Sequence, residues 1–483
     1  MFGLNPSQKD AIGLTFVLNQ LTPDSPYGTE KIKQITPFNR CCNKGLSVCF
    51  DNMEKIISLV KENKAEMEEL RLHLMSLKNI RAAVVKCSTQ TINHVEMFEV
   101  KNFLLTFEKL ERAFKKITDT MTLADIHLQP MNEALSVLDP TGLKIAAFTV
   151  DSPELQVIRS EKLRVEALLQ RADNPGAHNV LTTERFTLVK KEDMEESRVL
   201  QELSEKLRGY IPVFLSNMDH IGTLDLTIAK ALLALKYQAV RPTISGNSVL
   251  SFQNMSNPYV AEALAKNNQT ITKISLSMAK GVTIITGANM GGKSVSMKTA
   301  VLNAMLCHIG FFVFAEEAEV PLFDGIYLIS EDMQDVERGL SSFGAEILRF
   351  NEIAGRLKTD FLFIAMDEFA RGTNPEEGAS IVRAVASYLS DSGSVCVMAT
   401  HYDRIASPGF KHYQVAGLNV PDTEWEAQNA LSLIAAYMDY TLIETNPYAA
   451  PPRDALKICT LLGLDDEVLR RIEKEYEPLR KPG

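Results

Sequence analysis

A glycine-rich octapeptide in the second half of the chain constrains the fold more than any other feature. Residues 287–294 read GANMGGKS, which fits the phosphate-binding pattern G-x-x-x-x-G-K-[ST]. The β-branched run Val282 to Thr286 precedes the octapeptide, and the run Val295 to Leu306, with helical character, follows it. In such a strand–loop–helix unit, backbone N–H groups of the loop surround phosphate oxygens, and the helix directs its positive end at them. The pattern therefore predicts a P-loop.

The residues of this octapeptide have distinct expected tasks. The side chain of Lys293 would reach the β- and γ-phosphates of a bound nucleotide, and the hydroxyl of Ser294 would ligate Mg²⁺. The alternative is a glycine-rich turn with an incidental lysine, which the strand-like and helix-like flanks disfavour. The expected phosphate-binding set consists of Gly287, Asn289, Met290, Gly291, Gly292, Lys293 and Ser294.

An acidic pair follows an apolar run and begins 74 residues after Lys293. The run Phe361 to Met366 has the composition of a buried strand and leads directly into Asp367 and Glu368. An aspartate at the tip of a strand can hold Mg²⁺ through water, and a neighbouring glutamate can polarise the attacking water. Strands often end in solvated acids, so the pair is informative because of its place after the P-loop. We assign Asp367 to the metal and Glu368 to catalysis.

A histidine ends a further strand-like run. His401 follows Val395 to Ala399 within the sequence Ala-Thr-His-Tyr. A lone histidine at the end of a strand is usually structural. In this order, after a P-loop and an acidic pair, His401 is a candidate sensor of the γ-phosphate.

The two halves of the chain have different hydrophobic patterns. From about Ser275, short apolar runs alternate with helical stretches, which is typical of an α/β domain with a mainly parallel sheet. The first half is helical instead, because Asp51 to Ile80 and Val95 to Ile117 place apolar residues mostly at three- and four-residue steps. We predict an α/β P-loop domain preceded by an all-α region.

The middle of the helical half is less regular. Long helices are expected at Leu155 to Leu169 and at Asp193 to Leu235, with Pro212 kinking or breaking the second. Between them, the turn signal Asn-Pro-Gly at 174–176 and the partial alternation of Arg185 to Lys191 predict a small hairpin.

Charge and composition restrict the function classes. The net charge is −10, with 30 Lys and Arg against 31 Asp and Glu in residues 1–240 and 21 against 30 in the remainder. A bulk basic footprint for nucleic acid is therefore absent, although local basic patches stay open. The apolar runs are too short for a membrane helix, and the N-terminus lacks the pattern of a signal peptide. Seven scattered cysteines without a CxxC pair predict reduced thiols in the cytoplasm.

The motifs together resemble the ATPase domain of the MutS family, a branch of the ABC-type ATPases. The resemblance rests on residues 286–294, on the acidic pair with Arg371-Gly372-Thr373, on residues 399–402, and on the signature-like segment 339–343 preceded by Glu331-Asp332. It implies a homodimer that hydrolyses ATP with Mg²⁺, in which Ser341 contacts the γ-phosphate bound by the partner subunit. The alternative for Ser341 or Ser342 is the N-cap of a helix that starts near Phe343, with Glu346 supporting the cap.

The resemblance extends beyond the nucleotide site. Leu224-Asp225-Leu226 with Arg241-Pro242 is similar to the end of the family's helical core, and Leu462-Gly463-Leu464 is similar to part of its helical dimerisation tail. It implies a helical core and lever at 1–245 with a reduced DNA clamp near 171–196, a P-loop ATPase domain at 246–430, and the tail at 431–483.

The sequence also departs from the family pattern. We expect the chain to start almost directly in the helical core, without the N-terminal mismatch reader or the connector of the family. Ala288 replaces the usual proline and Val295 the usual threonine. The aromatic residue that stacks on adenine is not evident near Thr270-Ile271, so the base contacts are unassigned.

Three functions fit these observations. The first is a DNA mismatch repair-like ATPase whose binding to duplex DNA is weak and not mismatch-specific. The second is a chaperone-like reactivating ATPase, because truncated MutS-like proteins of this layout resemble the one associated with adenosylcobalamin-dependent lysine aminomutase. The third is a structural dimer with a vestigial site, which the intact motifs disfavour. The first function is favoured because it is the commoner one in the family. The second is favoured by the expected lack of a mismatch reader and by the acidic second half of the chain.

Overall fold

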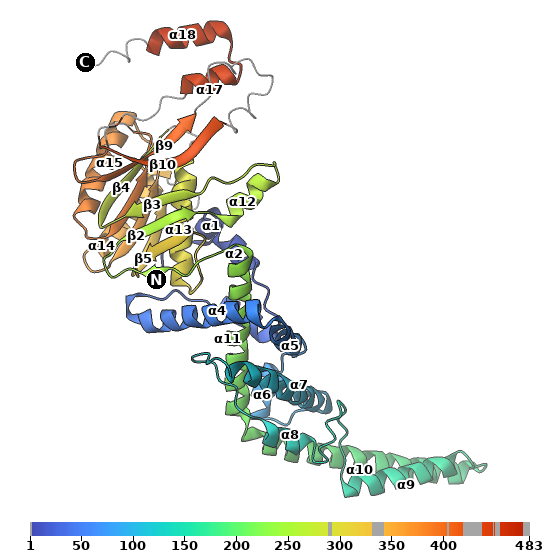
Figure 1. Ribbon diagram of the computed structural model, residues 1–483. Helices are drawn as coiled ribbons and strands as arrows, with labels where there is room; N and C mark the ends of the chain where they lie inside the picture. The colour runs from blue at the N-terminus through green and yellow to red at the C-terminus, as the bar shows by residue number, and fades with distance from the viewer. Residues whose placement is uncertain are drawn as a thin grey trace. The chain divides into compact units, whose positions relative to one another are not determined.

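The computed structural model describes residues 2–287, 292–330, 342–402, 405–418, 437–447, 449 and 455–476. An all-helical region up to residue 236 precedes a domain of mainly parallel strands flanked by helices, which confirms the predicted fold class (Figure 1). The chain divides into two compact units. One comprises Met1–Leu21, Thr36–Phe50 and Leu232–Gly483, and the other comprises Thr22–Ile35 and Asp51–Ala231.

The unit of residues 22–35 and 51–231 is built from amphipathic helices. In α7, His94–Thr118, Asn93 caps the first turn through a reciprocal pair of hydrogen bonds with Glu96, and one face buries Phe103 and Phe107. None of the described helices is both long enough and apolar enough to traverse a bilayer. The remaining helices are α3 Pro26–Lys33, α5 Lys64–Met75, α6 Arg81–Cys87, α8 Asn132–Leu138, α9 Pro153–Leu169 and α10 Pro175–Arg208, together with α4 Asn43–Glu62 and α11 Ile211–Lys236, which contribute to both units.

The small hairpin predicted for Arg185 to Lys191 is wrong, because these residues lie inside the long helix α10. Asn174 accepts a hydrogen bond from the Gly176 N–H at 2.9 Å, so the predicted turn signal is in fact the N-cap of this helix. α10 packs along α9, and ion pairs such as Arg185 to Glu166 at 2.8 Å join them. Alternation over three residues cannot be told from one turn of a helix. Pro212 does break the helix, since α11 begins one residue before it.

The α/β domain is organised around a six-stranded sheet of order β10-β9-β4-β8-β7-β6. All neighbours pair in parallel except β10 with β9. Its strands are β4 Gly281–Thr286, β6 Gly325–Ile329, β7 Leu362–Asp367, β8 Val395–Ala399, β9 Lys411–Leu418 and β10 Met438–Thr445. Helices α12 Pro258–Ala265, α13 Lys293–His308, α14 Ser342–Arg356 and α15 Pro375–Ser390 belong to the same domain, and the predicted tail contains α17 Ala455–Leu461 and α18 Asp466–Tyr476 besides β10.

A second sheet and the N-terminal residues complete this unit. The second sheet has the order β1-β5-β2-β3, with β1 Thr243–Ile244, β2 Leu250–Met255, β3 Ile274–Met278 and β5 Glu317–Val320. The N-terminal residues form α1 Pro6–Ala11 and α2 Leu14–Asn19, and η1 spans Arg40–Cys42. Gln8 donates to the carbonyl oxygen of Leu328 at 2.7 Å, and Asn257 donates to that of Ile12 at 3.0 Å. The first helices are thereby tied to the α/β domain.

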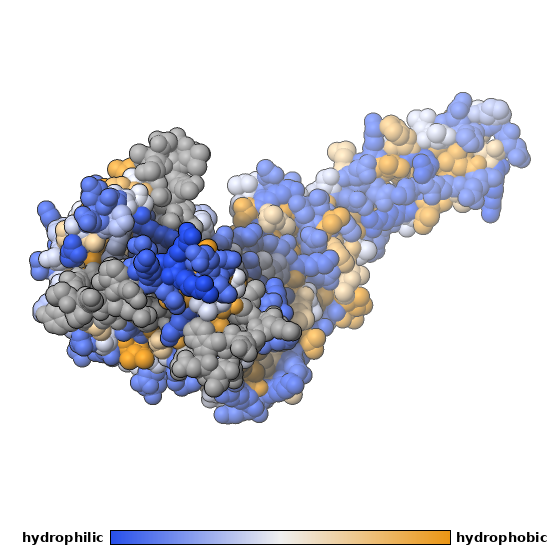
Figure 2. Space-filling model, turned by 90° about the horizontal axis from the view of Figure 1, so that it is seen from above, coloured by the Kyte–Doolittle hydropathy of each residue, from blue (hydrophilic) through white to orange (hydrophobic). Residues whose placement is uncertain are grey.

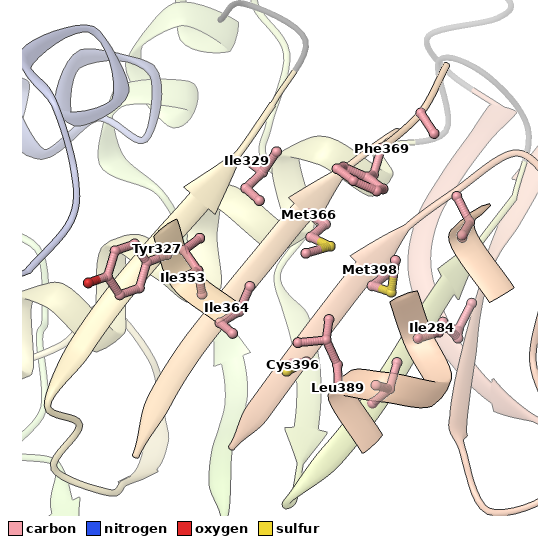
Figure 3. Close-up of a cluster of buried hydrophobic side chains, with 14 of the residues drawn as sticks. Ile284, Tyr327, Ile329, Ile353, Ile364, Met366, Phe369, Leu389, Cys396 and Met398 are labelled. Atoms are coloured by element: carbon pink, nitrogen blue, oxygen red, sulfur yellow. The ribbon is translucent and has the colours of Figure 1, made fainter. Parts of the chain in front are cut away.

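The core beside the six-stranded sheet is apolar and continuous. Figure 3 shows side chains of β4, β6, β7 and β8, among them Ile284, Ile329 and Met366, packed with Ile353 of α14 and Leu389 of α15. β4, β7 and β8 are buried along their whole length, as expected for parallel strands covered on both faces. This packing makes the carboxyl ends of the strands a rigid platform.

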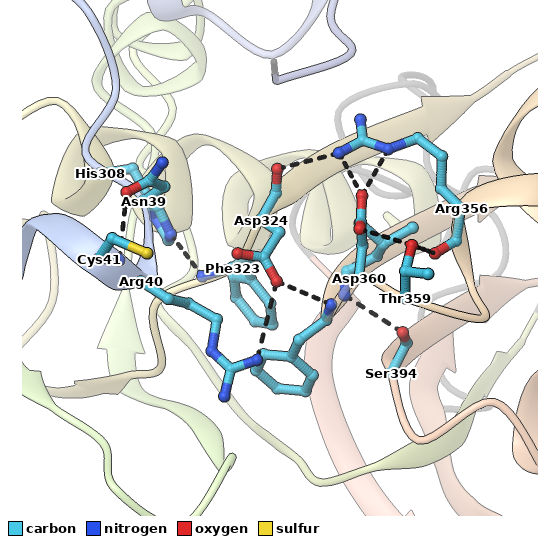
Figure 4. Close-up of polar contacts among 12 residues, drawn as sticks. Asn39, Arg40, Cys41, His308, Phe323, Asp324, Arg356, Thr359, Asp360 and Ser394 are labelled. Atoms are coloured by element: carbon cyan, nitrogen blue, oxygen red, sulfur yellow. Dashed lines mark hydrogen bonds and ion pairs between the residues drawn. The ribbon is translucent and has the colours of Figure 1, made fainter.

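A polar cluster holds the opposite end of the same sheet (Figure 4). His308, fully buried, donates from Nδ1 to the Ala304 carbonyl at 2.9 Å and accepts the Phe323 N–H at Nε2 at 2.8 Å. Both ring nitrogens are used by the neutral imidazole, and burial lowers the pKa of His308 to about 4. Asp324 accepts the Phe361 N–H at 2.9 Å and so joins the loop before β6 to β7.

Candidate active site

Three adjacent parallel strands bring the predicted site residues to one edge of the sheet. Gly287 follows β4, Asp367 ends β7, and His401 follows β8 by two residues. In the register, Ala399 lies opposite both Ile285 and Asp367, so the three strands end at the same level. Ligands of open α/β sheets bind outside such carboxyl ends. The structure therefore places the residues of separate motifs beside one another.

The P-loop lysine is buried at the start of α13. Lys293 is 4% exposed, and its Nζ donates to the carbonyl oxygen of Gly287 at 2.8 Å. Burial lowers the pKa of Lys293, and the negative charges of Glu368 and Asp367 oppose that shift. An ammonium group held out of water at a helix N-terminus is suited to an anion.

Two glycines of the P-loop are required by the backbone and by close neighbours. Gly287 has a φ of 142°, and a Cβ atom there would lie 2.9 Å from the Cβ of Val415 in β9. Gly292, with a φ of 83°, caps α13, and a Cβ atom there would lie 3.0 Å from the ring of Tyr440 in β10. The other predicted phosphate contacts, Asn289, Met290 and Gly291, lie outside the described residues, as do Glu331, Asp332 and Ser341.

Ser294 and Asp367 form the part of the site that fits a hard cation. The Ser294 hydroxyl donates to Asp367 Oδ1 at 2.7 Å, and Lys298 Nζ lies 3.9 Å from Asp367 Oδ2. Burial raises the pKa of Asp367, whereas the hydrogen bond from Ser294 and the charge of Lys298 lower it. A hydroxyl and a carboxylate oxygen are the donors that Mg²⁺ prefers, and both are adjacent here. The residues present therefore fit the metal expected beside a P-loop.

Glu368 is held in an unusual backbone conformation next to two basic side chains. Its φ is 49°, in the left-handed region, and its N–H donates to the Ala399 carbonyl at 2.9 Å. Arg371 donates to Glu368 Oε2 at 2.7 Å, and His401 Nδ1 lies 4.0 Å from the same oxygen. Two of the three predicted catalytic residues, Glu368 and His401, thus lie close together at the ends of neighbouring strands. Arg371, quoted for the family resemblance but not assigned to the site, belongs to it.

A cavity of about 910 Å³ adjoins these residues. Gly292, Lys293, Ser294 and Glu368 line one part of it, and Tyr440 and the polar loop 267–272 line another. The sequence gives no local signal for Tyr440, which reaches the cavity only because β10 pairs with β9. The aromatic residue expected to stack on adenine is not evident in the loop 267–272, and the ring of Tyr440 in β10 lines the cavity instead.

Comparison with known proteins connects this geometry to a family of domains. Residues 283–474 match the family model for MutS domain V. The chain is 32% identical to Endonuclease MutS2 of Caldicellulosiruptor bescii over 223 residues, which is 46% of this chain and 28% of that protein. It is 29% identical to Endonuclease MutS2 of Leuconostoc mesenteroides over 296 residues, 61% of this chain and 35% of that protein. The chain thus spans about a third of the length of these curated relatives, and most of its α/β part matches MutS domain V.

Proposed function

We propose that this chain is a Mg²⁺-dependent ATPase of the MutS family that acts as a homodimer. The observation that supports the proposal most strongly is that Lys293, Ser294 and Glu368 line one cavity, while Asp367 accepts a hydrogen bond from Ser294. Residues of a P-loop and of a following acidic strand that meet in this way bind a nucleoside triphosphate with its metal.

Each residue has a task that follows from its position. Lys293 would exchange its bond to Gly287 for bonds to the β- and γ-phosphates. Ser294 and Asp367 would hold Mg²⁺, which when bound supplies positive charge to the phosphate oxygens. Glu368 would orient a water molecule and accept its proton, and His401, which lies 4.0 Å from Glu368 at the adjoining strand end, would contact the γ-phosphate.

We assign the base of the nucleotide to the part of the cavity that Tyr440 and the loop 267–272 line. Tyr440 offers a ring there, and the loop 267–272 offers amide and hydroxyl groups that can pair with the edge of a base. Stacking of a base on an aromatic side chain contributes about 1–3 kcal/mol. This assignment fills the gap that the sequence left at the adenine.

The dimer is proposed from the resemblance and from the C-terminal helices. Ser341 would act on the nucleotide of the partner subunit. Leu462, Leu464 and Val468, in and around α17 and α18, are 52%, 37% and 42% exposed. Exposed apolar side chains in and between α17 and α18 favour a role in association.

The physiological partner is proposed to be duplex DNA, bound weakly and without preference for mismatches. The alternative is a protein partner, as for a reactivating ATPase of a cobalamin-dependent aminomutase. One observation favours the alternative: apolar side chains of the α9–α10 hairpin face solvent, including Val157, Leu163, Phe186 and Met194 at 62%, 65%, 59% and 74% exposure. Figure 2 shows hydrophobic patches among hydrophilic ones along this hairpin, the arm at the right of the view. Such a surface suits a protein better than a phosphate backbone.

Nucleotide titration of Lys293→Ala tests the ATPase assignment. We expect ATP affinity to fall at least tenfold, because a charge-assisted hydrogen bond is worth about 1.5–3 kcal/mol. Lys273→Ala is the matched control, since Lys273 is an exposed lysine of the same domain paired with Glu316. Circular dichroism verifies folding of both variants. Unchanged ATP affinity in folded Lys293→Ala protein would contradict the proposal.

A further inference from the structure

The turn that carries Glu368 holds two residues in backbone conformations that they avoid. Glu368 and Ala370 have φ values of 49° and 63°, in the left-handed region, and neither is a glycine. Such conformations cost free energy and persist only where the surroundings determine them.

Both backbone groups of Ala370 are held by buried side chains from other elements. The Ala370 N–H donates to Glu346 Oε2 at 2.8 Å, and the Tyr402 hydroxyl donates to the Ala370 carbonyl at 3.0 Å. Glu346 comes from α14 and is 1% exposed, and Tyr402, also buried, follows β8. A carboxylate that accepts a backbone N–H forms one of the stronger kinds of hydrogen bond.

Glu346 lies on the face of α14 that packs against the sheet, where its neighbours along the helix are apolar. Phe343, Ile347, Phe350 and Ile353 of the same helix pack against the core of the sheet. Their spacing of three and four residues defines an apolar stripe, and Glu346 lies within it. Burying a carboxylate among apolar side chains is costly unless it is hydrogen-bonded. An apolar residue would serve packing alone at this position.

We propose that Glu346 is a positioning residue for Glu368. By accepting the Ala370 N–H it stabilises the left-handed turn and thereby fixes the direction in which the Glu368 carboxylate faces the attacking water. The nucleotide itself is held by other residues, Lys293 and Ser294 among them. The inference rests on the proposed ATPase function and predicts a change in turnover without a change in nucleotide affinity.

Two substitutions separate positioning from packing. Glu346→Gln keeps a side-chain oxygen that can accept the N–H, and Glu346→Met fills the same space without an acceptor. We expect Glu346→Gln to keep kcat within about threefold and Glu346→Met to lose about 10- to 100-fold in kcat with KM within about twofold. Glu352→Met is the control, because Glu352 is exposed on the same helix. A Glu346→Met protein with normal kcat overturns the proposal, as does an equal loss in both Glu346 variants.

A second measurement does not depend on hydrolysis. Amide exchange of residues 368–373 should be at least tenfold faster in Glu346→Met than in the unmodified protein and unchanged in Glu346→Gln and Glu352→Met. If the unmodified protein binds no nucleotide, the proposed function fails, yet this exchange still decides whether Glu346 holds the turn. If Glu346→Met does not fold, Tyr402→Phe removes the bond on the other side of Ala370 and should give the same loss of kcat and protection. Unaltered exchange in the folded variant excludes the positioning role.

Discussion

The two carboxylates at the end of β7 have different surroundings, which supports the different tasks proposed for them. Asp367 is bound by the Ser294 hydroxyl and lies near Lys298, which suits a metal ligand. Glu368 turns away in a left-handed conformation toward Arg371 and His401. The strand ends at Asp367, and Glu368 follows it, so these two adjacent residues face different partners.

Glu368→Gln should bind ATP with nearly normal affinity and hydrolyse it about 10²–10⁴-fold more slowly, because the amide keeps the shape but cannot accept the proton of water. Single-turnover hydrolysis alongside equilibrium binding measures both quantities. Glu376→Gln, an exposed glutamate in the first turn of α15, is the control. Near-normal turnover of Glu368→Gln would show that another group activates the water.

His308 should make stability depend on pH. Its pKa is about 4 in the fold and 6.5 as the ordinary value, so the unfolded chain binds the proton more tightly. The neutral His308 side chain makes its full contribution to the free energy of unfolding above pH 6.5. That contribution is lost as pH falls from 6.5 toward 4, by up to roughly 3 kcal/mol. Urea unfolding between pH 4.5 and 7.5 measures this slope. The slope should shrink in His308→Gln, and an identical slope in that variant would assign the effect to other groups.

At the scale of elements, α15 approaches the turn that carries Glu368 so closely that only glycine fits at one of its positions. A Cβ atom at Gly378 would lie 2.2 Å from the Tyr402 hydroxyl and 2.9 Å from the Ala370 carbonyl oxygen. The helix, the end of β8 and the turn after β7 therefore meet at one point.

Gly378→Ala should lower the free energy of unfolding by about 1–3 kcal/mol, the usual cost of overpacking. It should also slow hydrolysis, because the methyl group displaces the Tyr402 hydroxyl from Ala370. Gly355→Ala is the matched control on α14, where the added methyl meets no atom, and it should leave stability unchanged or raise it by up to about 1 kcal/mol. Chemical denaturation and ATPase assays of the pair decide the matter. Equal stability of the two variants would mean that α15 moves to accommodate the added methyl group at little cost in free energy.

At the scale of the whole molecule, charge argues against strong DNA binding. The chain carries a net charge of −10, concentrated after residue 240. Binding to duplex DNA draws its free energy largely from the release of counterions by lysine and arginine. A protein of this charge must rely on a local basic surface, and its affinity should be modest.

Filter binding of matched and mismatched duplexes at two salt concentrations tests this expectation. We expect weak binding that falls as salt rises and equal affinities for the two duplexes. The Lys293→Ala variant, assayed in parallel, shows whether the nucleotide site influences the result. A clear preference for the mismatch would overturn the proposed lack of specificity, and binding insensitive to salt would refute the electrostatic argument.

Local patterns determined the fold class and the positions proposed for catalysis. The P-loop, the acidic pair and His401 each follow a strand, and the alternation of strands and helices predicts a parallel sheet whose ends carry them together. Pro212 likewise interrupts the long helix expected at Asp193 to Leu235 for a reason contained in its own ring. These features depend on a few consecutive residues, so a single sequence shows them.

Only the tertiary structure decided which distant residues complete the site. Tyr440 arrives through the antiparallel pairing of β10 with β9, and Glu346 and Tyr402 reach Ala370 across 24 and 32 residues. Arg185 to Lys191 shows the converse, because their partial alternation predicted a hairpin and packing along α9 made a helix. A contact between distant residues leaves no period in the sequence. Its free energy comes from burial and hydrogen bonds that exist once the sheet has formed.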